Sequence, residues 1–266
     1  MSVRKHASLA AMLGATSCLL AGVASAAQLN VIVTVRNLAP ANSVSFAPLQ
    51  LGFHNGVFDA FNNGQVATAP IISVAEGGAG TAWRQAFSAA EPNATVGVVG
   101  GLLQPGESRS SNFLIDTAAN PFFTFATMVV PSNDFFIGND SPMQHRLFDA
   151  AGNLLITSIG QTARQIWDAG SKTFDPAAAA FVGNNDLRTP QNGVVGFNFS
   201  ELSGFNGLVT GAGYTFQSAL LADTGIYRIE FATTQIPVPA PLGLLAAGLL
   251  AMGAVARRRA GTAVTR

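Results

Sequence analysis

Cysteine, histidine and charge are scarce in this sequence of 266 residues. Cys18 is the single cysteine, histidines number three, and 11% of the residues are charged. A chain without a cysteine pair forms no internal disulfide, so its own core must stabilise it. Zinc and iron sites draw on cysteine and histidine ligands, and the composition disfavours both. Ions that prefer oxygen ligands remain compatible with it.

Familiar catalytic motifs and clustered positive charge are lacking as well. The sequence has no G-x-S-x-G, no H-E-x-x-H and no Walker loop, and we interpret the glycine-rich "GGAGTAW" at 77–83 as a loop. The body at 28–235 holds 8 basic and 14 acidic residues, a formal charge of −6. Phosphate binding needs clustered Lys and Arg, so this balance argues against a nucleic-acid partner.

The first 26 residues have the pattern of a secretory signal peptide. Arg4 and Lys5 precede the apolar run "LAAMLGATSCLLAGVASA", which ends in an A-x-A cleavage site at 24–26. Cys18 lies inside this segment. We therefore expect an exported mature protein without cysteine.

Residues 236–266 form a second special segment. A V-P-x-P opening at 238–241 precedes a run of apolar and small residues to Ala256, and then Arg257, Arg258 and Arg259. The segment is compatible with a membrane anchor whose arginines stay cytoplasmic. It also resembles the PEP-CTERM sorting signals of Gram-negative bacteria, with Ala240 in place of the usual glutamate. That resemblance implies cleavage by an exosortase-like enzyme, and membrane contact only before processing.

The body at 28–235 has the pattern of one all-β domain. Apolar runs that alternate or are rich in Val and Phe are separated by Gly, Asn, Pro and Asp clusters, which predicts strands and turns. A hairpin is expected at "DAAGN" with "LLITS". Short helical turns are expected at 68–78 and at 176–183, where Asp175 precedes Pro176 as a cap. The predicted strands are 29–38, 111–117, 122–131, 145–149, 192–200 and 225–234.

Two stretches place an aspartate against aromatic or apolar residues and then a glycine. One is "PSNDFFIG" with Asp134, and the other is "IWDAGSK" with Asp168. Calcium takes six to eight oxygens from carboxylates and backbone carbonyls, which glycine-containing loops can supply. The simpler alternative is that both aspartates cap turns through their own backbone.

These stretches resemble a known module, the spondin N-terminal domain of F-spondin and mindin. "PSNDFFIG" is similar to its P-S-x-D-W/F-F-x-G motif, and "DAGSK" to its D-A-G-T-D/E motif. "FAPLQLGFHNGVFDAFNNGQVAT…AEGG" at 46–78 is similar to its upstream run. The resemblance covers roughly 29–235 and implies an eight-stranded antiparallel β-sandwich, C2-like, with a calcium site at one end.

Matched by position, the resemblance implies Asp134 and Asp168 as calcium ligands, with Asp140 as a possible helper. It departs at Lys172, which stands where the family has a carboxylate and is the only lysine of the body. An ammonium there repels a divalent ion. Two alternatives stay open: Asp175 supplies the missing oxygen, or Lys172 replaces the ion by pairing with Asp134 and Asp168.

The sequence thus predicts a non-catalytic protein of the Gram-negative cell surface or extracellular matrix. Adhesion or matrix interaction is the expected role, and the sorting tail suggests exopolysaccharide as the partner. One alternative is a secreted polysaccharide hydrolase that uses Asp134 and Asp168, with His54 as a further candidate. Another is a passive structural component. Trp83 is expected to be buried rather than to stack on sugar.

Overall fold

The computed structural model describes residues 28–235, and these form an all-β sandwich with two helices on one face. One antiparallel sheet has four strands in the order β5-β1-β11-β8. The other has seven strands, six of them in the order β10-β9-β7-β6-β3-β4, with β2 paired to β6. The expected fold class is confirmed, although the expected count of eight strands is wrong for the described part of the chain.

The strands and helices have these bounds. The strands are β1 (Gln28–Asn37), β2 (Ser45–Phe46), β3 (Leu49–His54), β4 (Thr95–Val99), β5 (Ser108–Asp116), β6 (Phe122–Val130), β7 (Phe135–Gly138), β8 (Ser158–Thr162), β9 (Trp167–Asp168), β10 (Gly196–Phe197) and β11 (Gly225–Gln235). The α-helices are α1 (Ala69–Gly77) and α2 (Thr81–Ala90), and the 3-10 helices are η1 (Ala163–Gln165), η2 (Pro176–Ala178), η3 (Asn185–Leu187) and η4 (Ser200–Phe205).

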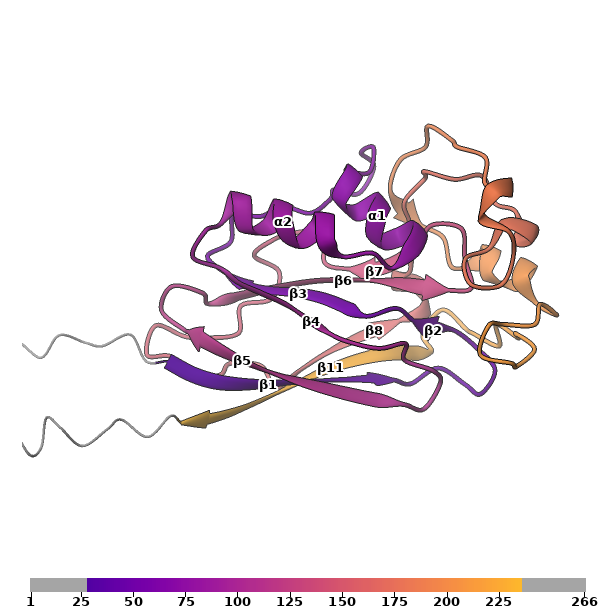
Figure 1. Ribbon diagram of the computed structural model, residues 1–266. Helices are drawn as coiled ribbons and strands as arrows, with labels where there is room; N and C mark the ends of the chain where they lie inside the picture. The colour runs from indigo at the N-terminus through magenta and orange to yellow at the C-terminus, as the bar shows by residue number, and fades with distance from the viewer. Residues whose placement is uncertain (1–27, 236–266) are drawn as a thin grey trace, which may run out of the picture.

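The seven-stranded sheet is the middle layer of three. Figure 1 shows α1 and α2 above it and the four-stranded sheet below it. Helix α1 packs on β6 and β7, and α2 packs on β3 and β4. One apolar core fills the space between the sheets, and a second, rich in aromatic rings, lies under the helices. The middle sheet is therefore buried on both faces.

Helix α2 approaches the middle sheet closely because β3 carries a glycine at the contact. A Cβ at Gly52 would collide with the ring of Phe87, which is fully buried. The same ring packs tilted against Phe58, with centroids 4.2 Å apart. The glycine thus lets an aromatic side chain lie directly on the strand backbone.

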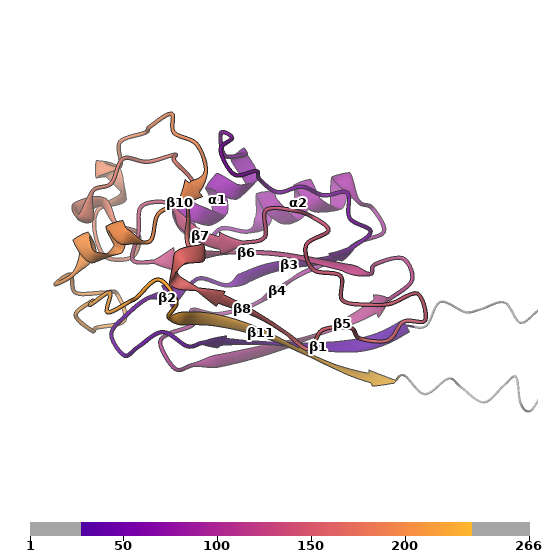
Figure 2. The same cartoon turned by 180° about the vertical axis from the view of Figure 1, so that it is seen from behind.

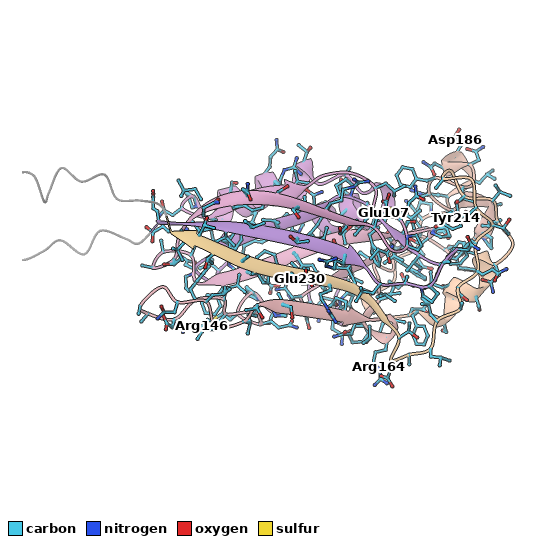
Figure 3. The ribbon with its side chains drawn as sticks, turned by 90° about the horizontal axis from the view of Figure 1, so that it is seen from below. Glu107, Arg146, Arg164, Asp186, Tyr214 and Glu230 are labelled. Atoms are coloured by element: carbon cyan, nitrogen blue, oxygen red, sulfur yellow. The ribbon has the colours of Figure 1, made fainter. Side chains whose placement is uncertain are left out.

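The outer face of the four-stranded sheet is polar, and its side chains form pairs between neighbouring strands. Arg36 of β1 forms an ion pair with Glu230 of β11 at 2.8 Å, and Thr34 lies 2.8 Å from Ser110 of β5. Figure 3 views this face, with Glu230 on β11. Such cross-strand pairs are typical of a sheet face that meets solvent.

Both ends of the described chain leave the sandwich together. β1 pairs with β11 so that Leu29 faces Gln235. Figures 1 and 2 show the two ends side by side, while the loops and 3-10 helices of 170–220 gather at the opposite end. We call this opposite end the loop end.

Several sequence predictions match these elements and several fail. The strands at 29–38, 111–117, 122–131 and 225–234 are confirmed as β1, β5, β6 and β11, and the helix at 68–78 as α1. Asp175 caps η2 as expected, its carboxylate accepting from Ala177 N at 2.9 Å.

Other predicted elements are shorter than expected. Residues 145–149 make only isolated bridges, one of which closes the expected "DAAGN" turn, and 192–200 holds only the two residues of β10 as strand. The interpretation of 77–83 as a loop is wrong, because α2 begins at Thr81. The predictions for 1–26 and 236–266 lie outside the described residues.

Candidate functional site

A buried carboxylate, Asp134, holds the loop end together. It lies between β6 and β7 and is 2% exposed. Its Oδ2 accepts hydrogen bonds from Ser171 N at 2.7 Å, Lys172 N at 2.8 Å and Ser171 Oγ at 3.0 Å. Asp134 thus binds the backbone of a loop 37 residues further along the chain.

Asp168 is brought beside Asp134 by strand pairing, as the sequence motifs predicted. β7 pairs with β9 so that Phe135 faces Asp168, and Ala169 N donates to Asp134 O at 3.1 Å. The Asp168 carboxylate accepts from Gly170 N at 2.7 Å and from Asn198 Nδ2 at 3.2 Å. Each aspartate therefore caps a turn, and the two turns are packed together.

Gly170 makes the close packing of this loop possible. Its φ of +63° lies in the left-handed region, and a Cβ there would approach Val194 O to 2.7 Å. Any other residue would have a strained backbone conformation, and its Cβ would clash with the neighbouring segment. The glycine of the D-A-G motif thus lets the loop lie against the chain at 193–194.

A third carboxylate, Glu76, and two cations complete the cluster. Glu76 Oε1 accepts from Ser171 Oγ at 2.8 Å and forms an ion pair with Lys172 Nζ at 3.5 Å. Arg188 donates to Glu76 O at 2.7 Å and to Ala178 O at 3.1 Å. The ammonium of Lys172 is therefore paired with Glu76, and not with Asp134 and Asp168 as one alternative proposed. Lys172 reaches Asp134 through its backbone N–H.

The other two predicted ligands contribute differently. Asp140 follows β7 while Asp134 precedes it, and six extended residues span about 20 Å, so Asp140 lies at the far end of this strand. Its Oδ1 accepts from Asn63 N at 3.1 Å. Asp175 lies at the loop end, where its backbone hydrogen-bonds to the side chain of Asn133, but its carboxylate caps η2. The structure therefore brings Asp134 and Asp168 together, and the carboxylates of Asp140 and Asp175 serve other turns.

His54 and Trp83 belong to the core under the helices. His54 is fully buried, with Nε2 2.9 Å from Thr124 Oγ1 and Nδ1 3.1 Å from Glu91 Oε1. It pairs with Phe122 at the start of β6, and the nine residues of β6 put about 30 Å between it and Asp134. Trp83 is fully buried against Phe58 and Phe87, as expected, so it offers no surface to a sugar.

The cluster as a whole fits a calcium ion poorly. Calcium needs six to eight oxygen ligands, whereas the Asp134 oxygen that faces the loop already accepts from three N–H or O–H donors. Lys172 and Arg188 add two positive charges beside the carboxylates. Within 28–235, no group of three or more His, Cys, Asp or Glu side chains is arranged to hold a metal ion.

The cluster also fits a hydrolase poorly. A glycosidase needs two acids on opposite walls of an open groove. Asp134 is 2% exposed and its Oδ2 already accepts three hydrogen bonds from the protein, so it is not presented to a polymer in an open groove. His54 lies too far away to assist.

Asp134 and His145 give the stability of the fold opposite responses to acid. Burial, and then the neighbouring Asp168 carboxylate, raise the pKa of Asp134 from 3.8 to about 6. Between these values the folded protein holds this proton more tightly than the unfolded chain, so stability rises as the pH falls. Burial lowers the pKa of His145 from 6.5 to about 4, so this group removes stability as the pH falls through the same window.

The two contributions oppose each other, so Asp134 and His145 together should change the stability of the wild type little between pH 7 and pH 4.5. Asp134→Asn removes the contribution that rises in acid, so on acidification over this range the variant should lose about 2 kcal/mol more stability than wild type. His145→Gln should show the reverse trend. Urea unfolding of the three proteins at both pH values measures this, and identical profiles for wild type and Asp134→Asn would contradict it.

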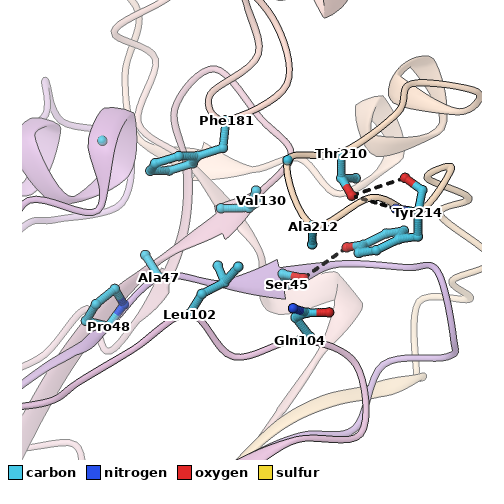
Figure 4. A pocket seen from close by; sticks show the side chains of 12 residues that line it. Ser45, Ala47, Pro48, Leu102, Gln104, Val130, Phe181, Thr210, Ala212 and Tyr214 are labelled. Carbon is cyan, nitrogen blue, oxygen red and sulfur yellow. Dashed lines mark hydrogen bonds between the residues drawn. The ribbon is translucent and has the colours of Figure 1, made fainter.

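A separate, mostly apolar cavity lies at the loop end. It has a volume of about 510 Å³, and its walls include Ala47, Leu102, Val130 and Phe181. Figure 4 shows Tyr214 on one side, with its hydroxyl hydrogen-bonded to Ser45 Oγ at 2.9 Å, and the ring of Phe181 on another. Phe181 has a φ of +60° and is 56% exposed, so a large apolar side chain is held outward beside an apolar hollow.

Sequence reasoning missed Glu76 and Arg188. Glu76 lies in the quoted "AEGG" stretch at the end of α1, and that motif was the available signal for it. Arg188 follows η3 in a loop without any recognisable pattern, and only the folded chain brings it to Glu76.

Fold and site together define an all-β sandwich with a loop end braced by an internal ionic and hydrogen-bond network. No protein-family model matches the sequence, and no curated protein matches it either. Within the described part of the chain, no helix has both the length and the apolar character needed to cross a membrane. The spondin and sorting-signal resemblances therefore remain proposals.

Proposed function

We infer that the protein is a non-catalytic β-sandwich module, exported by a Gram-negative bacterium and presented at the cell surface or in the extracellular matrix. One observation carries this proposal: the paired ends of β1 and β11 lie opposite the loop end. A tail attached after Gln235 would leave the loops and the apolar cavity facing outward. Figure 3 places Asp186 and Tyr214 at that outward end. Adhesion or matrix interaction through the loops follows from this orientation.

Surface labelling of cells tests the proposal. Asp186 and Asn185 lie in the exposed loop around η3, so Asn185→Cys introduces a thiol into a mature chain that we expect to have none. A membrane-impermeant maleimide should label this variant on intact cells that carry the full-length chain. Ile229→Cys, buried in β11, is the matched control and should stay unlabelled. Labelling of Asn185→Cys only after lysis would overturn the proposed display.

We propose further that the Asp134 cluster braces the loops without calcium. The donors already facing Asp134 and the pairing of Lys172 with Glu76 support this. Removing Lys172 leaves Glu76, Asp134 and Asp168 with Arg188 as the nearest cation, and Lys172→Glu adds a carboxylate where the spondin motif has one. The charge of the loop thus decides whether an ion is attracted.

A calcium titration followed by thermal melting tests this second proposal. The wild-type melting temperature should not change between EGTA and millimolar calcium, whereas Lys172→Glu should be destabilised in EGTA and recover in calcium. Magnesium is the control, because it demands a tighter octahedral site. A rise of the wild-type melting temperature in calcium that Asp168→Ala abolishes would show instead that the loop end binds the ion.

A further inference from the structure

A second, smaller cavity lies on the flank of the sandwich, and Asp134 is not part of its lining. Its volume is about 230 Å³, and it lies where β10 and β9 form one edge of the seven-stranded sheet and the chain crosses from β8 through η1. Figure 2 shows β10 beside β7 and α1, with β8 in the sheet below. Asp140, which the sequence singled out as a calcium helper, lines this cavity.

An exposed aromatic ring forms part of the cavity wall. Phe197 of β10 stacks on Trp167 of β9, with ring centroids 3.7 Å apart and planes 22° apart. Trp167 is fixed in place, since its Nε1 donates to Gly138 O at 3.0 Å and its ring packs edge-on against Phe61. Phe197 is nevertheless 54% exposed. A rigid stack thus presents a flat apolar ring to solvent.

Planar polar side chains supply the rest of the wall. They are the amides of Asn63, Gln144, Gln161 and Gln165 and the carboxylate of Asp140. Some of their atoms already form hydrogen bonds within the protein: Gln161 Nε2 donates to Gly160 O at 3.1 Å, and Gln165 Oε1 accepts from Thr162 N at 2.8 Å. Within 28–235 the opposite amide atoms, Gln161 Oε1 and Gln165 Nε2, have no hydrogen-bond partner in the protein, and neither has either amide atom of Gln144. Donors and acceptors thus line one small hollow.

These two features together match the chemistry of a sugar ring. A pyranose has one apolar C–H face, which stacks on an aromatic ring, and a rim of hydroxyls that both donate and accept hydrogen bonds. Amides and carboxylates are the planar groups that can satisfy adjacent hydroxyls. Asp140 is the only charged residue of the lining, and no Lys or Arg joins it there. An acidic sugar would meet a carboxylate that no cation of the lining offsets, so a neutral sugar is favoured.

We propose that this cavity binds one neutral pyranose unit, as a free sugar or as part of a polysaccharide. The proposal stands on the cavity and does not depend on where the protein is exported, although it would narrow the matrix partner to a neutral glycan. Phe197 supplies the stacking surface. Asp140, Gln144 and Gln161 supply hydrogen bonds to the hydroxyls.

The test uses the full-length chain and named sugars. Methyl glycosides of glucose, galactose and mannose are examined by saturation-transfer NMR, and dextran, galactomannan and alginate by affinity electrophoresis. We expect a millimolar dissociation constant for at least one methyl glycoside, as suits a ligand of that size in a shallow site. Alginate, which is acidic, should not bind. Retardation by dextran or galactomannan would identify a polymer as the source, and binding of the methyl glycosides alone a free sugar; both support the site.

Matched variants locate the binding. Phe197→Leu keeps an apolar side chain but removes the flat ring, and should weaken sugar binding about fivefold; Phe197→Tyr should keep it. Phe181→Leu changes an equally exposed ring at the loop-end cavity and should have no effect. Asp140→Ala and Gln144→Ala should each weaken binding, and Gln144→Ala, whose side chain makes no hydrogen bond within 28–235, should do so without lowering the melting temperature.

Three results would overturn the proposal. They are the absence of binding to every neutral sugar tested, equal binding by wild type and Phe197→Leu, and preferential binding of alginate. A change of oligomeric state in Phe197→Leu by size-exclusion chromatography, with no change in sugar binding, would assign the exposed edge strand to self-association instead. The surface-labelling experiment does not depend on sugar binding. If the sugar proposal fails, the proposed location at the cell surface can still be tested by labelling.

Discussion

Asp134→Ala should lower the free energy of unfolding by about 3 kcal/mol at pH 7. The substitution leaves the partly buried backbone N–H groups of Ser171 and Lys172 without an acceptor, and each such unpaired group costs about 1–3 kcal/mol. Removing a desolvated charge beside Asp168 offsets part of this loss. For a domain of this size the melting temperature should fall by about 10 °C.

Two variants give the Asp134 prediction its controls. Asp134→Asn keeps one oxygen acceptor and should cost about 1 kcal/mol. Asp186→Ala removes an exposed carboxylate at the same loop end and should leave the melting temperature unchanged. A melting temperature for Asp134→Ala equal to that of Asp186→Ala would show that the loop does not depend on the carboxylate.

Glu91→Ala should be still more destabilising, by about 4 kcal/mol. Glu91 follows α2, is almost fully buried, and accepts from the backbone N–H groups of Asn55, Val57 and Phe58 at 2.8, 2.6 and 2.5 Å. Burial alone would raise the pKa of Glu91, but these donors and His54 outweigh it and lower the pKa. The carboxylate therefore stays ionised and fixes the loop after β3 to the end of α2.

The Glu91 prediction has a local signature besides the loss of stability. Hydrogen exchange at the amides of Val57 and Phe58 should accelerate in Glu91→Ala, while that of the β1 amides should follow global unfolding only. Glu230→Ala breaks a surface ion pair and should cost no more than about 1 kcal/mol. Unchanged exchange at Val57 and Phe58 would refute the role of Glu91 in this loop.

The sequence reveals the long strands of this fold better than the short ones, for a physical reason. β1 has one buried face and one solvent face, so its buried and exposed residues alternate as a period-2 pattern. β3 and β7 are buried on both faces, because α1 and α2 cover the sheet, and their sequences show no alternation. Helix α2 begins after Gly80 with no side-chain cap, so its start carries no capping signal.

The candidate site also has residues that local sequence motifs predict and residues that only the folded chain brings together. Asp134 and Asp168 lie in motifs with local patterns, and strand pairing then brings them together. Lys172 pairs with Glu76 because α1 ends beside the loop, which depends on helix packing and not on local sequence. Phe197, Gln144 and Gln161 come from segments that meet only at the edge of the sandwich, so no motif marks their cavity.

The central position of β11 has a mechanical consequence. This strand runs to the last described residue and is paired with β1 from Tyr227 to Gln235 on one side and with β8 from Gly225 to Glu230 on the other. A pull between a tail at Gln235 and a partner held at the loop end would run along the strand, while its hydrogen bonds lie across that direction. The bonds would bear the force in shear and would have to break together rather than one by one. The pairing of β11 with β1, which reaches Gln235, is therefore what would hold the attachment point of such a tether in the sandwich.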